Sequence, residues 1–332
     1  MMQRLIGILV LLAALTAGWY WMDYQNFLRT PLTVPAEGLV VQVERGSNLR
    51  RLAHRLQQQG VLRSADLLYW HARWHELANR IRAGEYRVPP GTTPDGLLRI
   101  LVSGRTVEYP LTLVEGWTFR QVRAALARDP VLEKTLEGKS DAEVMALLGH
   151  PDEHPEGRFF PDTYRFPRGT TDLDLLRRAY RRMQQVLAEE WEGRDPEVAV
   201  KTPYEALILA SIVEKETGVA EERPLIAGVF TRRLKRGMKL QTDPTVIYGM
   251  GERYDGNIRR RDLREDTPYN TYVHAGLPPT PICMPGREAI HAVLHPAEGR
   301  ALYFVARGDG RHVFSETLKQ HNAAVRRYQL KR

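Results

Sequence analysis

An uncharged apolar segment near the N-terminus constrains this chain more than any other feature of its sequence. Residues 5–22 read LIGILVLLAALTAGWYWM, which is 18 consecutive positions without a charged side chain. A helix needs about 20 such residues to cross the hydrocarbon core of a bilayer. Trp19, Tyr20 and Trp21 close the segment as aromatic residues do at a membrane interface. We therefore expect residues 1–22 to form a transmembrane anchor.

A cleaved signal peptide is the alternative interpretation of this segment. Its apolar core would cover only about 7–15 residues and would end in a small-x-small cleavage site. Here the apolar run continues directly into bulky aromatic residues instead. An uncleaved anchor with so short an N-terminal tail usually exports the chain that follows it. The sequence thus predicts a single-pass protein of the cell inner membrane, held there through residues 5–22, with its main body in the periplasm.

Composition narrows the classes of partner and cofactor. The 332 residues are 43% hydrophobic and 27% charged, with a net charge of +8. That charge suits nucleic acid, an anionic membrane or an acidic polymer, but an exported domain does not meet nucleic acid. The single cysteine, Cys283, excludes multi-cysteine metal sites and is expected to be a packed thiol. His71 and His75 lack the glutamate of a His-Glu-x-x-His motif, so we expect no metal and no cofactor.

The remaining sequence divides into a linker, a small unit and a larger domain. Residues 23–37 are polar, contain proline and are interpreted as a linker. Residues 38–104 alternate short strand and helix signals and predict a self-contained β-α-α-β unit. Residues 105–332 are predicted to form one mixed α/β domain, which makes the fold class α+β.

Individual elements follow from capping residues and apolar spacing. In the small unit we expect strands at 39–43 and 84–88 around two helices, 49–59, capped by Ser47, and 64–81. In the larger domain the spacing predicts a strand at 106–113, helices at 118–128 and 172–192, a loop-rich region at 129–170, and a β-hairpin of 301–305 with 312–314.

One further helix has the composition of a buried element. Thr202 and Glu205 form a Thr-x-x-Glu capping box, with Pro203 at the first helical position. The next eight residues, 206–213, read ALILASIV and are apolar nearly all round. A helix of this kind lies in a protein interior.

Two carboxylates follow that apolar stretch before Gly218 ends the helix. At 100° per residue, Glu214 and Glu216 point about 200° apart and cannot share a site. Glu216 continues the apolar stripe of Leu209, Ile212 and Val213, which favours a desolvated carboxyl with a raised pKa. A general acid needs that property at neutral pH. The alternative is that both glutamates are solvated residues at a helix end.

Motifs in two regions resemble known families. The spacing of Val43, Gly46, Ser47, Leu49 and Leu52 resembles a LysM module, a family that binds N-acetylglucosamine polymers; a generic small α/β connector is the alternative. Residues 212–218, IVEKETG, resemble the signature helix of the endolytic murein transglycosylases, the YceG-like family. Further blocks of that family match 240–249 (LQTDPTVIYG), 268–272 (PYNTY), 276–279, 281–282, 156–157, 161–164, 295–296 and 321–322.

The resemblance implies cleavage of the β-1,4 bond between N-acetylmuramic acid and N-acetylglucosamine in nascent peptidoglycan strands. The expected product carries a 1,6-anhydromuramoyl end, so the reaction is a lyase reaction that terminates glycan elongation. The family's catalytic glutamate matches Glu216, the residue that the apolar stripe also selects. Peptidoglycan strands are the implied substrate, and peptidoglycan synthases are candidate partners.

The matching blocks also supply candidate substrate-binding residues. Their side chains offer hydrogen bonds to acetamido and hydroxyl groups or flat surfaces for sugar rings, although each could instead cap a helix or fix a loop. The candidates are Gln241, Thr242, Asp243, Tyr248, Tyr269, Asn270, Tyr272, Glu156 and Tyr164.

Two rival functions stay open at the level of sequence. A muramidase that hydrolyses with water would need a second carboxylate opposite Glu216, for which Asp243 and Glu214 are candidates. A non-catalytic scaffold at the site of wall synthesis would use the LysM-like unit to hold glycan. Mass spectrometry of digested glycan separates the three, because they leave anhydro ends, reducing ends and no products respectively.

Overall fold

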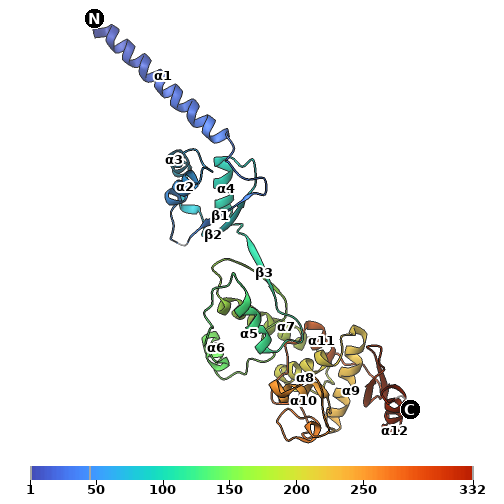
Figure 1. Cartoon of the computed structure of the whole chain (residues 1–332). Coiled ribbons are helices and arrows are strands. Elements are labelled where there is room, and N and C mark those ends of the chain that lie inside the picture. The colour runs from blue at the N-terminus through green and yellow to red at the C-terminus, as the bar shows by residue number, and fades with distance from the viewer. Residues whose placement is uncertain (1, 45, 331–332) are drawn as a thin grey trace. The chain divides into compact units, whose positions relative to one another are not determined.

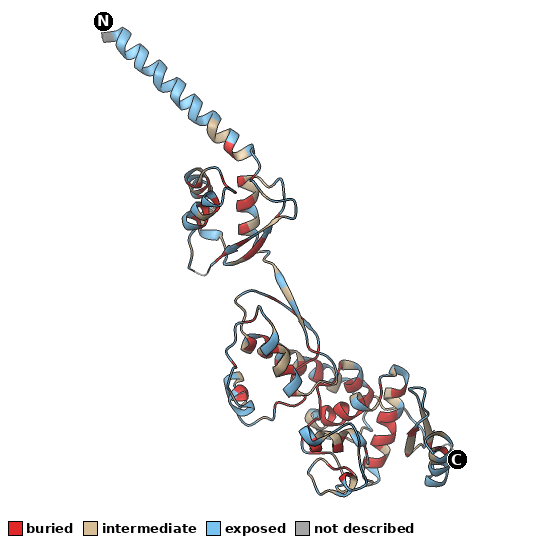
Figure 2. Ribbon diagram, in the orientation of Figure 1, coloured by how far each residue is buried: buried red, intermediate tan, exposed pale blue. Residues whose placement is uncertain are grey.

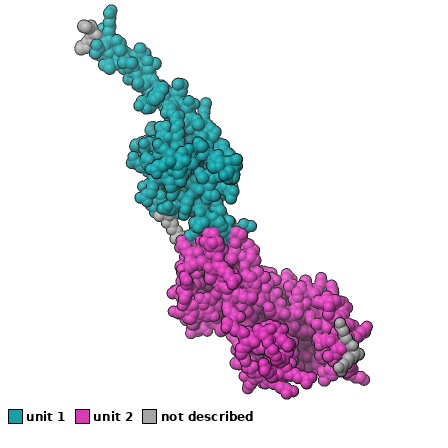
Figure 3. Space-filling view, in the orientation of Figure 1, with its two compact units in different colours: residues 1–109, 165–169 teal, residues 110–164, 170–332 magenta. Residues whose placement is uncertain are grey.

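The computed structural model describes residues 2–44 and 46–330, and the chain separates into two compact units. Unit 1 contains residues 1–109 and 165–169, and unit 2 contains residues 110–164 and 170–332 (Figure 3). Together the described residues form a mixed α/β structure with an apolar N-terminal helix (Figure 1).

The N-terminal helix α1 runs from Met2 to Arg29 and is longer than the apolar segment itself. Up to Met22 its apolar side chains are exposed (Figure 2), and in the part of the chain that is described it is the one helix long and apolar enough to cross a membrane. Residues 23–29, expected to belong to a linker, are helical. The physical reason is Phe27, which is fully buried in the core of unit 1 and ties this last part of the helix to it.

Unit 1 contains the expected β-α-α-β order. Strands β1 (Leu39–Val43) and β2 (Gly84–Val88) pair antiparallel, with Val41 opposite Tyr86. Helices α2 (Leu49–Gln58), α3 (Ala65–Trp74) and α4 (Pro94–Ser103) cover the core.

Two boundaries in unit 1 differ from the prediction. Helix α2 is capped by Asn48, whose side chain accepts from the backbone N–H of Arg51 at 2.9 Å, and not by Ser47. Helix α3 ends at Trp74, because Glu76 takes a left-handed backbone conformation (φ 56°), and a short 3-10 turn, Ala78–Arg80, follows.

The chain passes between the units within a pair of strands. Strand β3 (Glu108–Thr112) pairs with β4 (Thr163–Pro167), and each strand contributes residues to both units. The region 129–170, expected to be loop-rich, also contains β4 and helix α6 (Asp141–Leu148), which the prediction did not name. Ser140 and Glu143 form a complete capping box at the start of α6, which was a signal available in the sequence.

Unit 2 is built around helix α8 (Pro203–Glu216), whose residues 206–213 are all buried, as their composition predicts (Figure 2). Helices α7 (Asp172–Glu192), α9 (Arg223–Lys235) and α11 (Arg287–Leu294) pack around it. The shorter helices are α5 (Phe119–Arg128) and α10 (Asp243–Met250), with 3-10 turns at Ala220–Glu222, Gly251–Arg253 and Asp262–Arg264.

The C-terminal part of unit 2 is the expected hairpin followed by a helix. Strands β5 (Tyr303–Ala306) and β6 (His312–Ser315) pair antiparallel, and α12 (Leu318–Tyr328) packs on them. Strand β5 also contacts α9, so the hairpin lies against the helical core that carries α8.

Candidate active site

The end of helix α8 places one carboxyl group in a pocket. Glu216 is its last residue and is half-buried, and the hydroxyl of Thr242 donates a hydrogen bond to its Oε1. Burial raises the pKa of Glu216 to about 7 against the opposing hydrogen bond from Thr242, and the nearby Asp243 adds to the rise. A carboxyl with this pKa is protonated in a large share of molecules near neutral pH and can donate a proton.

Glu214 lies on the other side of the helix, as the helical geometry predicts. Its Oε2 accepts from the backbone N–H of Gly286 at 3.0 Å, and it does not line the pocket of Glu216. Burial raises the pKa of Glu214 as well. The two glutamates therefore serve different places, one facing a pocket and one holding the loop before α11.

The pocket at Glu216 has a volume of about 490 Å³. Its walls come from the end of α8, from α9, from the segment that leads into α10, from the β5–β6 hairpin and from α12. The polar and aromatic side chains among its lining are Glu216, Arg233, Gln241, Thr242, Asp243, Tyr272, Tyr303, Phe304, His312, His321, Asn322 and Gln329.

Buried Arg233 holds two walls of this pocket together. Its guanidinium donates to the carbonyl of Leu240 at 2.8 Å and to that of Leu302 at 2.7 Å, which joins the segment before α10 to the hairpin. It also lies over the ring of Tyr303, 5.1 Å from the ring centre. Gln241, the residue after Leu240, has a left-handed backbone conformation (φ 53°), so the segment turns sharply just before Thr242.

Four of the nine predicted substrate-binding residues meet at this pocket: Gln241, Thr242, Asp243 and Tyr272. Tyr272 donates its hydroxyl to Oδ1 of Asp243 at 2.6 Å, and burial raises the pKa of Tyr272. Asp243 is also the first residue of α10, but no side-chain hydrogen bond caps that helix start, so the capping alternative is not supported.

Three others form a separate cluster that does not line the pocket. Glu156 accepts from the backbone N–H of Phe119 at 2.9 Å and from the hydroxyl of Tyr248 at 3.0 Å. Tyr248 packs edge-on against Tyr269, whose hydroxyl shares a hydrogen bond with Thr280 at 2.8 Å. Burial raises the pKa of Glu156 to about 7 against these hydrogen bonds. Sugar contact at these three residues stays a prediction.

Asn270 and Tyr164 are used by the fold. The amide of Asn270 donates to the carbonyls of Asp262 and Glu265 at 3.0 and 2.7 Å, and its Oδ1 accepts from the N–H of Tyr272 at 3.0 Å. The buried Tyr164 donates its hydroxyl to the carbonyl of Phe160 at 2.7 Å. Neither lines the pocket, and their polar atoms already have protein partners.

The pocket also contains residues that the sequence reasoning missed. His312 shares a 2.7 Å hydrogen bond between its Nδ1 and Oε2 of Glu222. His321 stacks on Tyr303 with ring centres 5.3 Å apart, and its buried Nδ1 has no hydrogen-bond partner within the described residues. Burial lowers the pKa of His321, and Arg233 adds to this. The 321–322 pair was part of the family resemblance and was the signal that could have placed α12 at the site.

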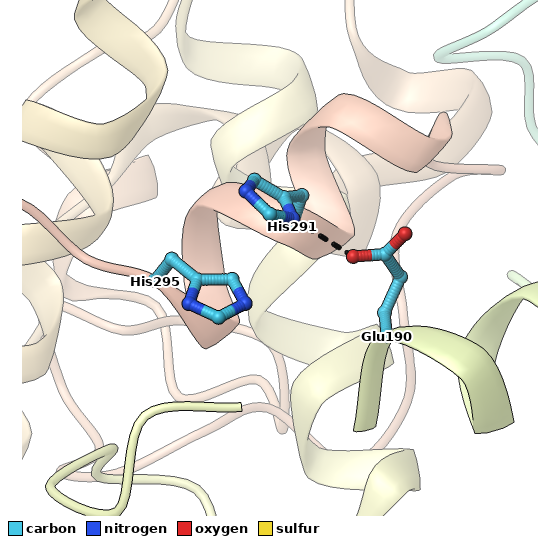
Figure 4. Close-up of side chains that lie close together, drawn as sticks. All are labelled: Glu190, His291 and His295. Carbon is cyan, nitrogen blue, oxygen red and sulfur yellow. Dashed lines mark hydrogen bonds and ion pairs between the residues drawn. The ribbon is translucent and has the colours of Figure 1, made fainter. Parts of the chain in front are cut away.

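A histidine–glutamate cluster elsewhere in unit 2 has metal-ligand chemistry (Figure 4). The ligand atoms of Glu190, His291 and His295 lie within 4.8 Å of one another. Both oxygens of Glu190 are already engaged, one by Arg287 at 2.6 Å and one by His291 at 2.8 Å. We therefore interpret the cluster as an ion-pair network that joins the ends of α7 and α11. It does not line the pocket of Glu216.

Cys283 is a buried thiol, as its position predicts. Its Sγ donates to the carbonyl of Ser211 at 3.3 Å, and burial raises its pKa well above the ordinary value. A thiol held protonated in this way is a poor nucleophile.

A single desolvated carboxyl at the end of a buried helix, facing a polar and aromatic pocket, defines a general acid–base site. The chain belongs to the YceG-like family, which matches residues 41–327. An endolytic murein transglycosylase from Bacillus subtilis is 32% identical and covers 87% of this chain and 84% of its own length. One from Streptococcus pneumoniae is 28% identical over 96% of this chain, which spans 64% of that protein.

A solved structure has the same fold. A YceG-like protein from Listeria monocytogenes superimposes with a TM-score of 0.53 and 29% sequence identity, over 87% of this chain and 99% of the other. This likeness, like the sequence matches, extends over both units rather than over the helix of Glu216 alone.

Proposed function

We propose that this chain is an endolytic lytic transglycosylase that cleaves the β-1,4 bond between N-acetylmuramic acid and N-acetylglucosamine in nascent peptidoglycan. The observation that carries the proposal is the raised pKa of Glu216, about 7, inside a pocket large enough for sugar. The names of the relatives from Bacillus and Streptococcus support it. Glycan strands ending in 1,6-anhydromuramic acid are the expected product.

One carboxyl group suffices for this chemistry. Protonated Glu216 gives its proton to the glycosidic oxygen as the bond to the muramic C1 breaks. The muramic N-acetyl group stabilises the positive charge that develops there. The ionised Glu216 then takes the proton of the sugar's own 6-hydroxyl, whose oxygen closes the anhydro ring on C1. Because that hydroxyl is tethered to the reacting centre, it competes well against water.

The surroundings of Glu216 support this role. The hydrogen bond from Thr242 occupies Oε1 and leaves Oε2 to carry the transferred proton. Tyr303 and Phe304 offer flat surfaces in the lining of the pocket, and Gln241, Tyr272 and His321 bring polar side chains to it. We assign sugar contact to Gln241, Tyr272 and His321 on these grounds.

The products of digestion test the proposal directly. The detergent-solubilised protein is incubated with uncrosslinked glycan strands, and the fragments are analysed by mass spectrometry. We expect internal cleavage that leaves anhydromuramoyl ends. Each such fragment is lighter than the corresponding fragment with a reducing end by the mass of one water (~18 Da), because no water is added in the reaction. A preparation that is folded and yields no fragments contradicts the proposal and leaves the scaffold function.

A hydrolytic muramidase is the second candidate, and Asp243 is the observation that favours it. Its carboxyl shares the pocket with Glu216 and could act on a water. Its Oδ1 is, however, engaged by the hydroxyl of Tyr272, and would have to give up that hydrogen bond to hold a water. If hydrolysis is the reaction, the fragments carry reducing ends and Asp243→Asn abolishes their formation; transglycosylation requires only Glu216.

Unit 1 is proposed to bind glycan without catalysing its cleavage. Between β1 and α2 it has a groove of about 220 Å³, lined in part by Val40, Gln42 and Gln59. Replacing Gln42 and Gln59 together by alanine should weaken binding to insoluble peptidoglycan while turnover of short soluble strands persists. Gln58→Ala, at the last residue of α2 and outside the groove, is the control. Unchanged binding by the double variant would refute this role.

We propose that α1 anchors the protein in the cell inner membrane and that residues from about 23 onward lie in the periplasm. The apolar surface of α1 up to Met22 supports this. Protease added to intact spheroplasts should degrade the main body of the protein, and complete protection would refute the topology. Nascent strands leave a synthase in the same membrane, so a peptidoglycan synthase is the proposed protein partner, to be captured by photo-crosslinking in cells.

A further inference from the structure

Helix α3 exposes two tryptophans side by side. Trp70 and Trp74 are 63% and 87% exposed and lie four residues apart, so they share one face of the helix. Trp117 and Trp191, in unit 2, are both partly buried. A pair of exposed tryptophans on one helical face is the kind of apolar patch that marks an interaction site.

Contacts with α1 place this helix beside the end of the anchor. Nδ1 of His71, the residue after Trp70, lies 2.6 Å from the hydroxyl of Tyr24. Arg63, just before α3, forms an ion pair with Asp23 at 2.5 Å. Phe27 is buried in the same core as Leu68 of α3. Helix α3 therefore contacts α1 through His71, immediately after the apolar segment.

The depth of this contact follows from helix geometry. Tyr24 is two residues beyond Met22, the last apolar residue of the span, and thus about 3 Å further along the helix axis. The headgroup layer of a bilayer is about 5–7 Å thick on each side of the hydrocarbon core. A helix that contacts Tyr24 therefore meets the headgroup layer when α1 spans the membrane.

We propose that Trp70 and Trp74 form a membrane-seating surface, which inserts into the headgroup layer next to the anchor. Tryptophan suits this layer because its ring is apolar and its N–H can bond to water or lipid oxygens. The inference rests on the proposed role of α1 as an anchor. Because Phe27 already holds unit 1 to the end of α1, the tryptophan pair adds a second attachment to the bilayer, and the glycan groove of unit 1 keeps a fixed tilt to it.

Environment-sensitive labels in the full chain test this surface. The buried Cys283 is shielded from reagents, so one introduced cysteine can be labelled with the fluorophore NBD. Arg73→Cys places the label on the exposed side of α3, one residue before Trp74 and about one turn after Trp70. Arg87→Cys, exposed on β2, is the matched control, and Leu12→Cys reports on the span itself. The labelled proteins are reconstituted into vesicles of phosphatidylethanolamine and phosphatidylglycerol.

We expect the label at position 73 to become several-fold brighter and protected from an aqueous quencher in vesicles, while that at position 87 stays accessible. Replacing Trp70 and Trp74 by serine should abolish the protection at 73 without changing the protection at 12. A label at 73 that stays in water while 12 is protected overturns the seating surface alone. A label at 12 in water overturns the anchor and this inference with it.

Two further outcomes also overturn the inference. Protection at position 73 that disappears when the protein is diluted in excess lipid would mean that a second copy covers the tryptophans. Protection that survives the double serine variant would mean that another part of unit 1 contacts the bilayer. Circular dichroism of the double variant establishes that the loss of protection is not a loss of folding.

Discussion

The hydroxyl of Thr242 donates a hydrogen bond to the carboxyl of Glu216, which joins the end of helix α8 to the segment before α10. This bond stabilises the ionised carboxylate, whereas burial of Glu216 disfavours it. Burial is the larger of these two effects and the nearby Asp243 adds to it, so the balance gives a pKa of about 7. A group that must act first as an acid and then as a base benefits from such a balance near the working pH.

Removing the transferable proton of Glu216 should remove activity. Glu216→Gln keeps the size of the side chain and its hydrogen-bonding capacity, and general acid–base assistance contributes typically 10²–10⁴-fold. Since one residue serves in both half-steps, we expect a loss near the upper end of that range. Release of anhydromuropeptides, measured by liquid chromatography and mass spectrometry, reports the loss.

The matched control for this substitution is Glu214→Gln on the same helix. Its carboxyl holds the N–H of Gly286 outside the pocket, so a folded variant should keep most of its turnover. If Glu214→Gln alone abolished activity in a folded protein, or if Glu216→Gln kept it, the assignment of the catalytic acid would be wrong.

Removing the Thr242 hydroxyl should move the pH dependence of the reaction. In Thr242→Val the carboxylate loses the hydrogen bond that favours its charged form, so the pKa of Glu216 rises above about 7. The fall of kcat/KM on the alkaline side should then occur at higher pH than in the wild type, at a lower maximal rate. Thr242→Ser, which keeps the hydroxyl, should restore the wild-type position. If the alkaline fall of kcat/KM stays at the same pH in Thr242→Val, the hydroxyl of Thr242 does not influence the pKa of Glu216 and the prediction is wrong.

The raised pKa of Glu216 predicts how stability changes with pH. The folded state binds this proton more tightly, since the pKa rises from 4.5 to about 7. The contribution of Glu216 to the free energy of unfolding should therefore be fully present below pH 4.5 and fall as pH rises through 7, by ~2 kcal/mol for a half-buried group. Glu216→Gln lacks this dependence. The free energy of unfolding of the variant, relative to that of the wild type, should therefore increase between those two pH values. Urea unfolding at pH 5 and pH 8 measures the difference, and a constant difference contradicts the prediction.

Asn270 should matter for stability more than for substrate affinity. Asn270→Ala leaves the buried carbonyls of Asp262 and Glu265 and the N–H of Tyr272 without their partner, at a cost of ~2–4 kcal/mol. We expect a lower melting temperature. Gln241→Asn, which tolerates the left-handed backbone at the pocket wall, should instead raise KM with little loss of stability. The opposite pattern would make Asn270 a substrate ligand.

Local signals predicted most of the elements of this fold. Apolar spacing and capping residues located α7 and α8. The apolar composition of residues 206–213 also showed that α8 is buried, as it is at the centre of unit 2. Local pattern failed where tertiary contacts decide. Residues 23–29 are polar enough to suggest a linker, but burial of Phe27 in unit 1 keeps them helical. The short α6 was missed although Ser140 and Glu143 cap it.

The candidate site was predictable only in part for a similar reason. The position of Glu216 follows from the period of one helix, and Gln241, Thr242 and Asp243 followed from one contiguous block. Which wall of the pocket faces these residues depends on long-range packing. His312 and His321 reach the pocket from a hairpin and a helix that lie 70 and 79 residues after Thr242 in the chain. Asn270 lies in a matching block, yet its amide holds the loop and not the pocket, a distinction that sequence type cannot make.

The chain leaves unit 1 through β3 and returns to it through β4, and this limits how a gene segment that encodes unit 1 can be transferred by recombination. Residues 165–169 complete unit 1 from within the sequence of unit 2: Phe166 is fully buried, and Arg168 pairs with Glu85 at 2.6 Å. A gene fragment ending near residue 105 would therefore encode unit 1 without the strand that closes it. A recombination event that transferred unit 1 intact would have to carry residues 165–169 as well, and with them the intervening residues 110–164 of unit 2.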